Sequence, residues 1–173
     1  LEMSIGKKKI YWDTCIFLAW LKEEKNEIGV MEGIEEVVRK IHNNEIILIT
    51  SQITYIEVLQ SRLDSDAQKK WKDIFNRRNY QMGDVTPKVG EKSHFIRDYY
   101  DQKGIKLSTQ DSIQLATAII YGADEFHTLD GSGKPRNGDL IPLNGNVAGH
   151  KLKICVPYAE QGSLLTGIPA MNP

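Results

Sequence analysis

The stretch from residue 108 to residue 131, STQDSIQLATAIIYGADEFHTLDG, constrains the fold of this 173-residue chain most strongly. Ser108 is a good helix N-cap, because its hydroxyl can accept a hydrogen bond from a free backbone N–H of the first turn. Apolar residues then recur at helical spacing as far as Gly122, which suits the position just beyond a helix end. Residues 126–129, FHTL, follow as a short strand. The stretch therefore predicts a capped helix that feeds a buried strand.

Two carboxylates flank this predicted unit. Asp111 precedes Leu115 by four positions, so its side chain projects from the inward side of the helix. Asp130 ends the strand, and in α/β sheets the carboxyl ends of strands are where sites form. Each residue also has a plain structural explanation. Asp111 can be the far half of a capping box with Ser108, and Asp130 can belong to a turn.

Length and composition predict one domain with an ordinary core, because the chain is 40% hydrophobic and too short for two domains. We expect this domain at residues 3–157 and a tail at 158–173. No apolar run has transmembrane length and no signal-peptide pattern is present, so we expect a cytoplasmic protein without membrane contact. The two cysteines, Cys15 and Cys155, fit a reducing compartment and form no CxxC metal motif.

A third carboxylate follows the first predicted strand. Residues 9–12, KIYW, have the pattern of a buried strand, and Asp13 stands at its carboxyl end. The alternative explanation for Asp13 is an N-cap, because a helical pattern begins directly after it. Residues 45–50, EIILIT, form the clearest buried strand in the chain. Two strands joined through helices predict a parallel pair with a right-handed crossover.

A fourth carboxylate, Glu57, lies on the helix after this second strand. Ser51 is the expected N-cap of that helix. Glu57 stands at the edge of the apolar stripe, where an unpaired charge would cost several kcal/mol. The alternative is a salt bridge at the core boundary with Arg62 or a lysine. The stripe that we expect to face the core consists of Ile53, Ile56, Leu59 and Leu63.

The predicted elements run strand, helix, helix, strand, helix, helix, weak strand, helix, helix, strand, strand. This order predicts a three-layer α/β/α domain with a mainly parallel central sheet. A segment rich in Gly, Asn and Pro occupies residues 131–151, between the last two strands. A loop of this length in a small domain is either functional or mobile.

On this plan Asp13, Glu57, Asp111 and Asp130 converge at one end of the sheet. Four carboxylates in one pocket repel one another unless cations join them. Oxygen ligands without a nearby His or Cys cluster favour Mg²⁺ or Mn²⁺ over Zn²⁺. Such a site suits phosphodiester hydrolysis, because a bound metal activates water and neutralises charge on the phosphate.

Two hydroxyls stand beside or near these carboxylates. Thr14 and Ser132 are candidates to bond a ligand or a metal-bound water, and ordinary turn or capping chemistry is the alternative for both. Other motifs offer no rival chemistry. There is no paired His spacing for a zinc hydrolase, and there is no GxGxxG, P-loop or GxSxG motif.

Four stretches together resemble the acidic motifs of PIN-domain nucleases, most like the VapC-type toxins of toxin–antitoxin pairs: WDTCIFLAWL, SQITYIEVLQSRL, LSTQDSIQLATAII and HTLDG. The resemblance spans residues 10–156. It implies a PIN-like fold and Mg²⁺- or Mn²⁺-dependent cleavage of single-stranded RNA, with Asp13, Glu57, Asp111 and Asp130 as the acidic set. It also implies a homodimer and, for the toxin branch, a small antitoxin partner.

Three alternatives stay open at this point. The long loop and the tail exceed a minimal toxin, which leaves a housekeeping PIN nuclease outside toxin–antitoxin systems. A non-catalytic PIN-like module would bind RNA or a protein partner without cleaving. A phosphatase with Asp13 as nucleophile is less favoured, because that chemistry usually needs a second acid two residues on, where Cys15 stands.

Overall fold

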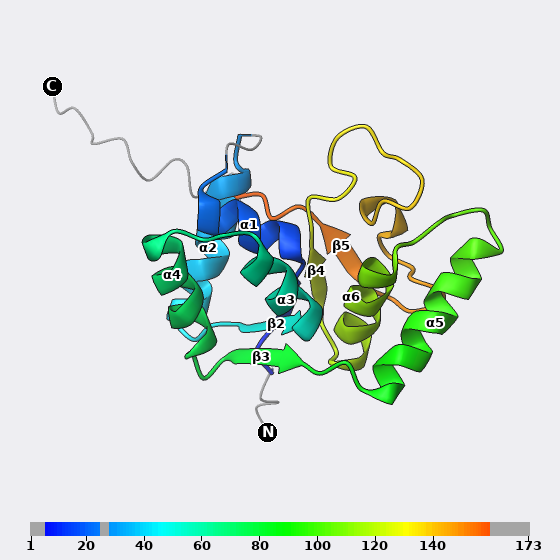
Figure 1. Ribbon diagram of the computed structural model, residues 1–173, viewed down its shortest axis with the longest axis horizontal. Helices are drawn as coiled ribbons and strands as arrows, with labels where there is room; N and C mark the ends of the chain where they lie inside the picture. Colours follow the sequence, from blue (N-terminus) through cyan, green and yellow to red (C-terminus); the bar gives the residue numbers. More distant parts are fainter. Residues whose placement is uncertain (1–5, 25–27, 160–173) are drawn as a thin grey trace, which may run out of the picture.

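The computed structural model describes residues 6–24 and 28–159, which form a parallel sheet covered by helices on both faces (Figure 1). Five strands, all parallel, lie in the order β3-β2-β1-β4-β5. The strands are β1 (Lys9–Trp12), β2 (Ile47–Ser51), β3 (Tyr80–Gly83), β4 (Glu125–His127) and β5 (Lys153–Cys155). The helices are α1 (Thr14–Lys22), α2 (Val30–His42), α3 (Gln52–Gln60), α4 (Ser65–Phe75), α5 (Pro87–Asp101), α6 (Thr109–Ile120) and the 3₁₀ turn η1 (Ile141–Leu143).

The central strand β1 is the point where the winding of the sheet reverses. Its neighbours are β2 on one side and β4 on the other, and both pair with it in parallel register. The chain first adds β2 and β3 on one side of β1, then crosses over to add β4 and β5. The crevice at the carboxyl ends of the strands beside such a reversal is the common ligand site of open α/β sheets.

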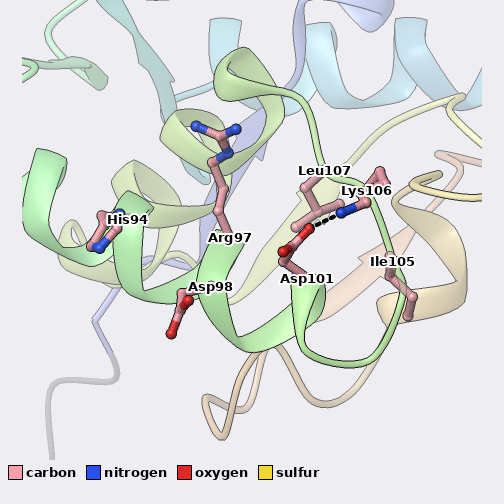
Figure 2. A pocket seen from close by; sticks show the side chains of 7 residues that line it. All are labelled: His94, Arg97, Asp98, Asp101, Ile105, Lys106 and Leu107. Atoms are coloured by element: carbon pink, nitrogen blue, oxygen red, sulfur yellow. Dashed lines mark hydrogen bonds and ion pairs between the residues drawn. The ribbon is translucent and has the colours of Figure 1, made fainter.

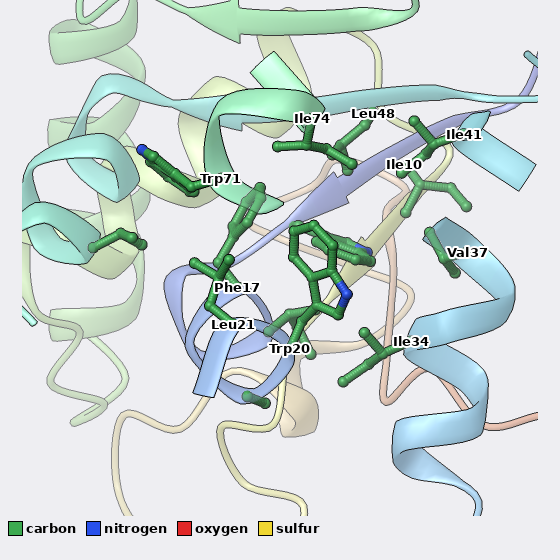
Figure 3. Packing of buried hydrophobic residues seen from close by; sticks show 14 of the residues in the cluster. Ile10, Phe17, Trp20, Leu21, Ile34, Val37, Ile41, Leu48, Trp71 and Ile74 are labelled. Carbon is green, nitrogen blue, oxygen red and sulfur yellow. The ribbon is translucent and has the colours of Figure 1, made fainter. Parts of the chain in front are cut away.

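Alternate side chains of β1 point to opposite faces of the sheet and pack into two separate hydrophobic cores, as the two-residue period of a strand requires. Ile10 and Trp12 pack with α1, α2 and α4 on one face, where Figure 3 shows Ile10 among the side chains of these helices. Phe17 meets Trp12 edge to face there, with ring centroids 5.1 Å apart. Tyr11 faces the other way and stacks on Phe126 of β4 at 4.9 Å, beneath α5 and α6. The three-layer α/β/α prediction is confirmed, and the sheet is wholly parallel.

The prediction for the buried face of α3 was wrong for Ile56 and Leu59, whereas Ile53 and Leu63 are half-buried and Leu63 packs against the core. Ile56 and Leu59 are 53% and 56% exposed, and Leu63 lies beyond the end of the helix. The residues that face inward are Thr54 and Val58, both fully buried. The reason is that α3 packs against a polar side chain, Gln114 of α6. The hydroxyl of Thr54 therefore faces inward and donates to Gln114, where an isoleucine could not. Hydrophobic spacing alone does not reveal such a contact.

The loop at residues 131–151 is packed rather than loose. It contains η1, and its apolar side chains Leu140 and Val147 are fully buried in the core beneath α5 and α6. Asn137 fastens it to the turn between those helices, donating to the carbonyl of Gly104 at 2.8 Å and accepting from the backbone of Lys106 at 2.8 Å. The loop therefore builds one wall of the domain.

Other boundaries shift by a few residues. The strand expected at residues 45–50 is β2 at Ile47–Ser51, and the strand expected at residues 126–129 is β4 at Glu125–His127. After β5 the chain crosses α2 so closely that a Cβ on Gly33 would lie 1.8 Å from the carbonyl oxygen of Pro157. Most of the predicted tail, residues 160–173, lies outside the described residues. No described helix has the length and apolar character needed to cross a membrane.

Candidate acidic site

Asp13 lies directly after β1 and is 7% exposed. It is also the N-cap of α1, since its Oδ1 accepts the backbone hydrogen of Thr14 at 2.7 Å. Its Oδ2 accepts the hydroxyl hydrogen of Thr128 at 2.8 Å, and its own backbone N–H donates to the carbonyl of His127 at 3.1 Å. The two explanations weighed for Asp13, strand end and helix cap, are therefore both correct.

The pKa of Asp13 is raised to about 6, first by burial and then by the nearby charge of Asp111, which together outweigh the lowering effect of the hydrogen bonds from Thr128 and Thr14. A carboxylate with these surroundings is short of positive charge. No lysine or arginine among the described residues forms an ion pair with it. A bound cation would supply the missing charge.

Glu57 projects from α3 and is half-buried. Its Oε2 accepts the hydroxyl hydrogen of Thr14 and also lies 3.5 Å from the side-chain nitrogen of Gln114. Gln114 in turn donates to the hydroxyl oxygen of Thr14 at 2.9 Å. No ion pair between Glu57 and Arg62 is present in the described part of the chain. The carboxylate is thus held by neutral groups, which leaves its charge uncompensated.

A buried network positions these groups. The carbonyl oxygen of Gln114, on α6, accepts hydrogen bonds from the hydroxyls of Tyr11 and Thr54, the latter at 3.1 Å. All three side chains are almost fully buried. They join β1, α3 and α6 just behind Thr14 and Glu57. Sequence reasoning missed Gln114, although a glutamine on the otherwise apolar inward face of a helix was a visible signal.

Asp111 lies in the first turn of α6 and is half-buried. Its backbone N–H donates to the hydroxyl of Ser108 at 2.9 Å, and that hydroxyl donates to Oδ2 of Asp111 at 2.6 Å. Ser108 is therefore the N-cap as predicted, and the carboxylate of Asp111 pairs with its hydroxyl rather than with its backbone N–H as in a capping box. Asp111 also raises the pKa of both Asp13 and Asp130, so its charge acts on the same region.

Asp130 follows β4 and is held by the loop at residues 131–151. Its Oδ2 accepts the backbone hydrogen of Leu140 at 3.0 Å, and its N–H donates to the hydroxyl of Thr128 at 3.0 Å. Burial raises the pKa of Asp130, and the charges of Asp139 and Asp111 raise it further. Asp139 is a fifth acid, buried in the loop, that sequence reasoning did not single out.

The supporting hydroxyls differ in their placement. Thr14 lies between Asp13 and Glu57 and contacts both. Ser132 is exposed in the turn after Asp130, where its backbone N–H donates to the carbonyl of Leu129 at 3.1 Å. For Ser132 the structure gives a turn contact and no contact with a carboxylate. Thr128, which was not predicted, links the two aspartates that end β1 and β4.

The four predicted acids surround one region at the carboxyl ends of β1 and β4, but they are not tightly clustered. Within residues 6–24 and 28–159, the one group of three potential ligands within 4.8 Å of one another lies elsewhere. Mg²⁺ is usually bound through one or two carboxylates and keeps several waters. The all-oxygen donor set and the raised pKa values of Asp13 and Asp130 therefore fit an ion of this kind.

A cavity of about 230 Å³ lies beside the start of α6, between α5 and the chain leading to Leu107 (Figure 2). Lys106 is paired with Asp101 in this cavity. Arg97 extends from α5 away from that pair and is exposed. The lining carries two carboxylates, Asp98 and Asp101, beside Arg97 and Lys106, and the exposed guanidinium of Arg97 is the one of these cations without an ion-pair partner in the described part of the chain.

The fold and the acidic residues at the carboxyl ends of its strands define a class of protein. A family model for the PIN domain matches residues 10–132, which is well over half of the chain. The chain therefore belongs to the PIN domain family. PIN domains are nucleases as a class.

Solved structures of toxin–antitoxin proteins share the fold. VapBC2 from Rickettsia felis, solved bound to a DNA fragment from its promoter, has a TM-score of 0.60 and 16% identity over 84% of this chain and 98% of its own. DNA-bound VapBC from Salmonella typhimurium has a TM-score of 0.55 and 16% identity over 85% and 98%.

A third solved relative is VapC20 from Mycobacterium tuberculosis, described as a sarcin–ricin loop cleaving toxin. It has a TM-score of 0.52 and 15% identity over 76% of this chain and 99% of its own. No curated protein matches the sequence significantly. At these identities the solved structures establish the fold alone. The activity has to be inferred from the residues of the site.

Proposed function

We propose that this PIN domain is a metal-dependent endoribonuclease that cleaves single-stranded RNA, and that it is the toxin of a toxin–antitoxin pair. The observation that carries the proposal is the state of Asp13. It is buried at the end of the central strand, its pKa is raised to about 6, and Asp111 adds to that shift. An acid in this environment is suited to binding a cation.

The proposed ligands of Mg²⁺ or Mn²⁺ are Asp13, Glu57, Asp111 and Asp130, directly or through water. A bound ion of this kind lowers the pKa of a water molecule and neutralises charge that builds on the phosphate oxygens. The protein's part is to hold the carboxylates in place. Thr128 and the backbone N–H of Thr14 each bond one oxygen of Asp13, so each of these oxygens keeps a further lone pair for the ion or its waters. The Thr14 hydroxyl bonds Oε2 of Glu57, which leaves Oε1 for the same role.

Two observations support RNA as the substrate: an exposed arginine near the acids, and the fold shared with a sarcin–ricin loop cleaving toxin. Arg97 offers an exposed positive charge beside the turn that carries Asp111, where a phosphate of the bound strand would be attracted. The structurally similar Mycobacterium toxin is described as cleaving the sarcin–ricin loop. Single strands suit such a site, because their backbone can bend toward the acids.

An antitoxin partner and a homodimer are part of the proposal. The similar proteins from Rickettsia and Salmonella were solved as VapBC complexes. In this chain Ile56 and Leu59 lie exposed on α3, which is the helix that carries Glu57. Purifying the chain together with a small protein encoded beside its gene, and measuring the mass of the complex, tests both parts of the proposal.

The test of the activity uses a pool of labelled single-stranded RNA with Mg²⁺, Mn²⁺ or EDTA. The wild type is expected to cleave only with metal, and Asp111→Asn is expected to abolish cleavage while the protein stays folded. Asp66→Asn, at an exposed position in α4, is the matched control and should cleave at the wild-type rate. Full activity of Asp111→Asn would overturn the assignment. RNA binding without cleavage, independent of metal, would favour a non-catalytic module.

A further inference from the structure

A second group of potential metal ligands lies where β4 pairs with β5. Glu125 and His127 belong to β4, and Cys155 is the residue of β5 that stands in register with His127. One ligand atom from each of the three side chains lies within 4.8 Å of the others. His127 and Phe126 alternate along the strand, so this group faces α2 and not the core beneath α5 and α6.

The hydrogen bonding of His127 leaves one ring nitrogen available. Its Nε2 lies 3.0 Å from Oε2 of Glu125, and a carboxylate only accepts hydrogen bonds, so Nε2 carries the proton. Nδ1 is therefore a bare lone pair. It is buried, it has no hydrogen-bond partner among the residues that the structure describes, and the side chain is 4% exposed as a whole. A buried lone pair without a partner needs an explanation, and a bound cation is one.

The three side chains also line a cavity of about 250 Å³ between α2 and the sheet. This volume has room for an ion and for waters to complete its coordination. Cys155 is half-buried, and no disulfide joins it to Cys15. The group can therefore be reached from solvent. It supplies its own nitrogen, sulfur and oxygen atoms and needs none of the acids at the strand ends.

We propose that Nδ1 of His127 and Sγ of Cys155 bind a borderline-soft divalent cation of the Zn²⁺ class, at a site separate from the nuclease acids, while Glu125 orients the imidazole through Nε2–H and waters complete the coordination. Imidazole and thiolate are the ligands that such ions prefer. Cys155 loses its thiol proton to solvent when the cation binds. Ligands around a tetrahedral zinc lie about 3.5 Å apart, since the bonds are about 2.0–2.3 Å, so modest side-chain rotation closes the site.

Two lysines add positive charge beside this site, which opposes the binding of a cation. Lys8 and Lys153 contact Oε1 of Glu125 at 2.8 and 2.6 Å, which leaves Oε2 toward the histidine. Both lysine side chains are about half exposed, at 49% and 60%, so they can turn toward water when a cation arrives. The same lysines would favour an anion in the cavity. A cation site and an anion site therefore predict opposite effects when one lysine is removed.

Cobalt provides the direct test, because a Co²⁺–thiolate bond has its own near-ultraviolet charge-transfer absorption. Co²⁺ added to the full chain should produce this band, Cys155→Ser should abolish it, and Cys15→Ser should leave it unchanged. Zn²⁺ added afterwards should remove the band by competition. No band, or a band that persists in Cys155→Ser, would overturn the proposal.

Affinity and thermal stability complete the test. Zn²⁺ should raise the melting temperature of the wild type and of Asp13→Asn equally, since the nuclease acids take no part. Glu125→Gln should weaken zinc binding about ten- to a hundredfold, the usual effect of removing a carboxylate that orients a ligating histidine. Lys153→Gln should strengthen it. Stabilisation by inorganic phosphate instead of zinc, lost in Lys153→Gln, would identify an anion site and contradict the proposal.

Discussion

Thr128 donates its hydroxyl hydrogen to Oδ2 of Asp13 at 2.8 Å, across 115 positions of sequence. The same hydroxyl accepts the backbone hydrogen of Asp130 at 3.0 Å. One fully buried threonine therefore connects the two aspartates that follow the neighbouring strands β1 and β4. The spacing of these acids depends on a residue that carries no charge of its own.

Thr128→Val keeps the shape of the side chain and removes these two hydrogen bonds together with the 3.3 Å contact between the hydroxyl and Sγ of Cys15. We expect a loss of about 1–3 kcal/mol in the free energy of unfolding, because the N–H of Asp130 loses its buried partner. The pKa of Asp13 should rise further, because a hydrogen bond that lowers it is gone. Denaturant unfolding and the pH profile of cleavage measure the two effects. Thr117→Val, which removes only a bond to the carbonyl of Ile113 within α6, should leave the pH profile unchanged.

The raised pKa of Asp13 predicts a particular pH dependence of stability. The unfolded state releases this proton near the ordinary pKa of about 3.9, whereas the folded state retains it up to about 6. Between these values the unfolded state binds fewer protons, so this group lowers stability as the pH rises, and the loss is complete above 6.

Asp13→Asn keeps the helix cap and removes this titration. In EDTA, we expect the unfolding free energy of the variant relative to the wild type to increase by about 1–3 kcal/mol between about pH 4 and about pH 7. Denaturant unfolding of both proteins across this pH range measures the difference in unfolding free energy. The other titratable groups are the same in the two proteins, so their contributions largely cancel. A difference that does not vary with pH would show that Asp13 has an ordinary pKa.

Gln114→Leu removes the amide that joins Thr14, Glu57 and Tyr11. The tyrosine hydroxyl is then buried without an acceptor, so we expect a loss of about 1–3 kcal/mol in stability. Cleavage should fall as well, because Glu57 loses its support. Gln102→Leu, at an exposed helix end, is the matched control. Unchanged cleavage by a folded Gln114→Leu protein would show that Glu57 needs no such positioning.

Arg97→Ala tests the proposed path of the RNA. If this side chain contacts a phosphate, its removal should weaken binding similarly for different sequences. The slope of log affinity against log salt should decrease by about 1. Binding assays on Asp111→Asn protein, which leaves the RNA intact, measure this at several salt concentrations. If the slope for Arg97→Ala equals that of the protein with Arg97 intact, Arg97 does not contact a phosphate and the RNA follows another path.

The order of helices and strands, and the elements on or after which the four acids lie, could be predicted from the sequence, because each depends on local signals. The run KIYW before Asp13 and the cap Ser108 before Asp111 are patterns of adjacent residues, and the structure places both as expected. Contacts between distant segments could not be predicted in this way. Thr128 meets Asp13, and Gln114 meets Glu57, only because parallel strands and their helices bring them to one end of the sheet.

The error in α3 has the same origin. Spacing marked Ile56 and Leu59 as core residues, whereas the fold turns Thr54 toward a polar wall made by Gln114. A short helix can present either of two neighbouring faces, and the partner on the other side determines which face is buried. The identity of that partner is a property of the whole fold.

The most direct test of the acidic site is Mn²⁺ binding followed by electron paramagnetic resonance, because free Mn²⁺ gives a strong signal that bound Mn²⁺ loses. We predict that the wild type binds Mn²⁺, that Asp13→Asn binds it far more weakly, and that Glu125→Gln binds it as the wild type does. Equal binding by the wild type and Asp13→Asn would contradict the assignment of Asp13 and its neighbouring carboxylates as the metal site of this PIN domain.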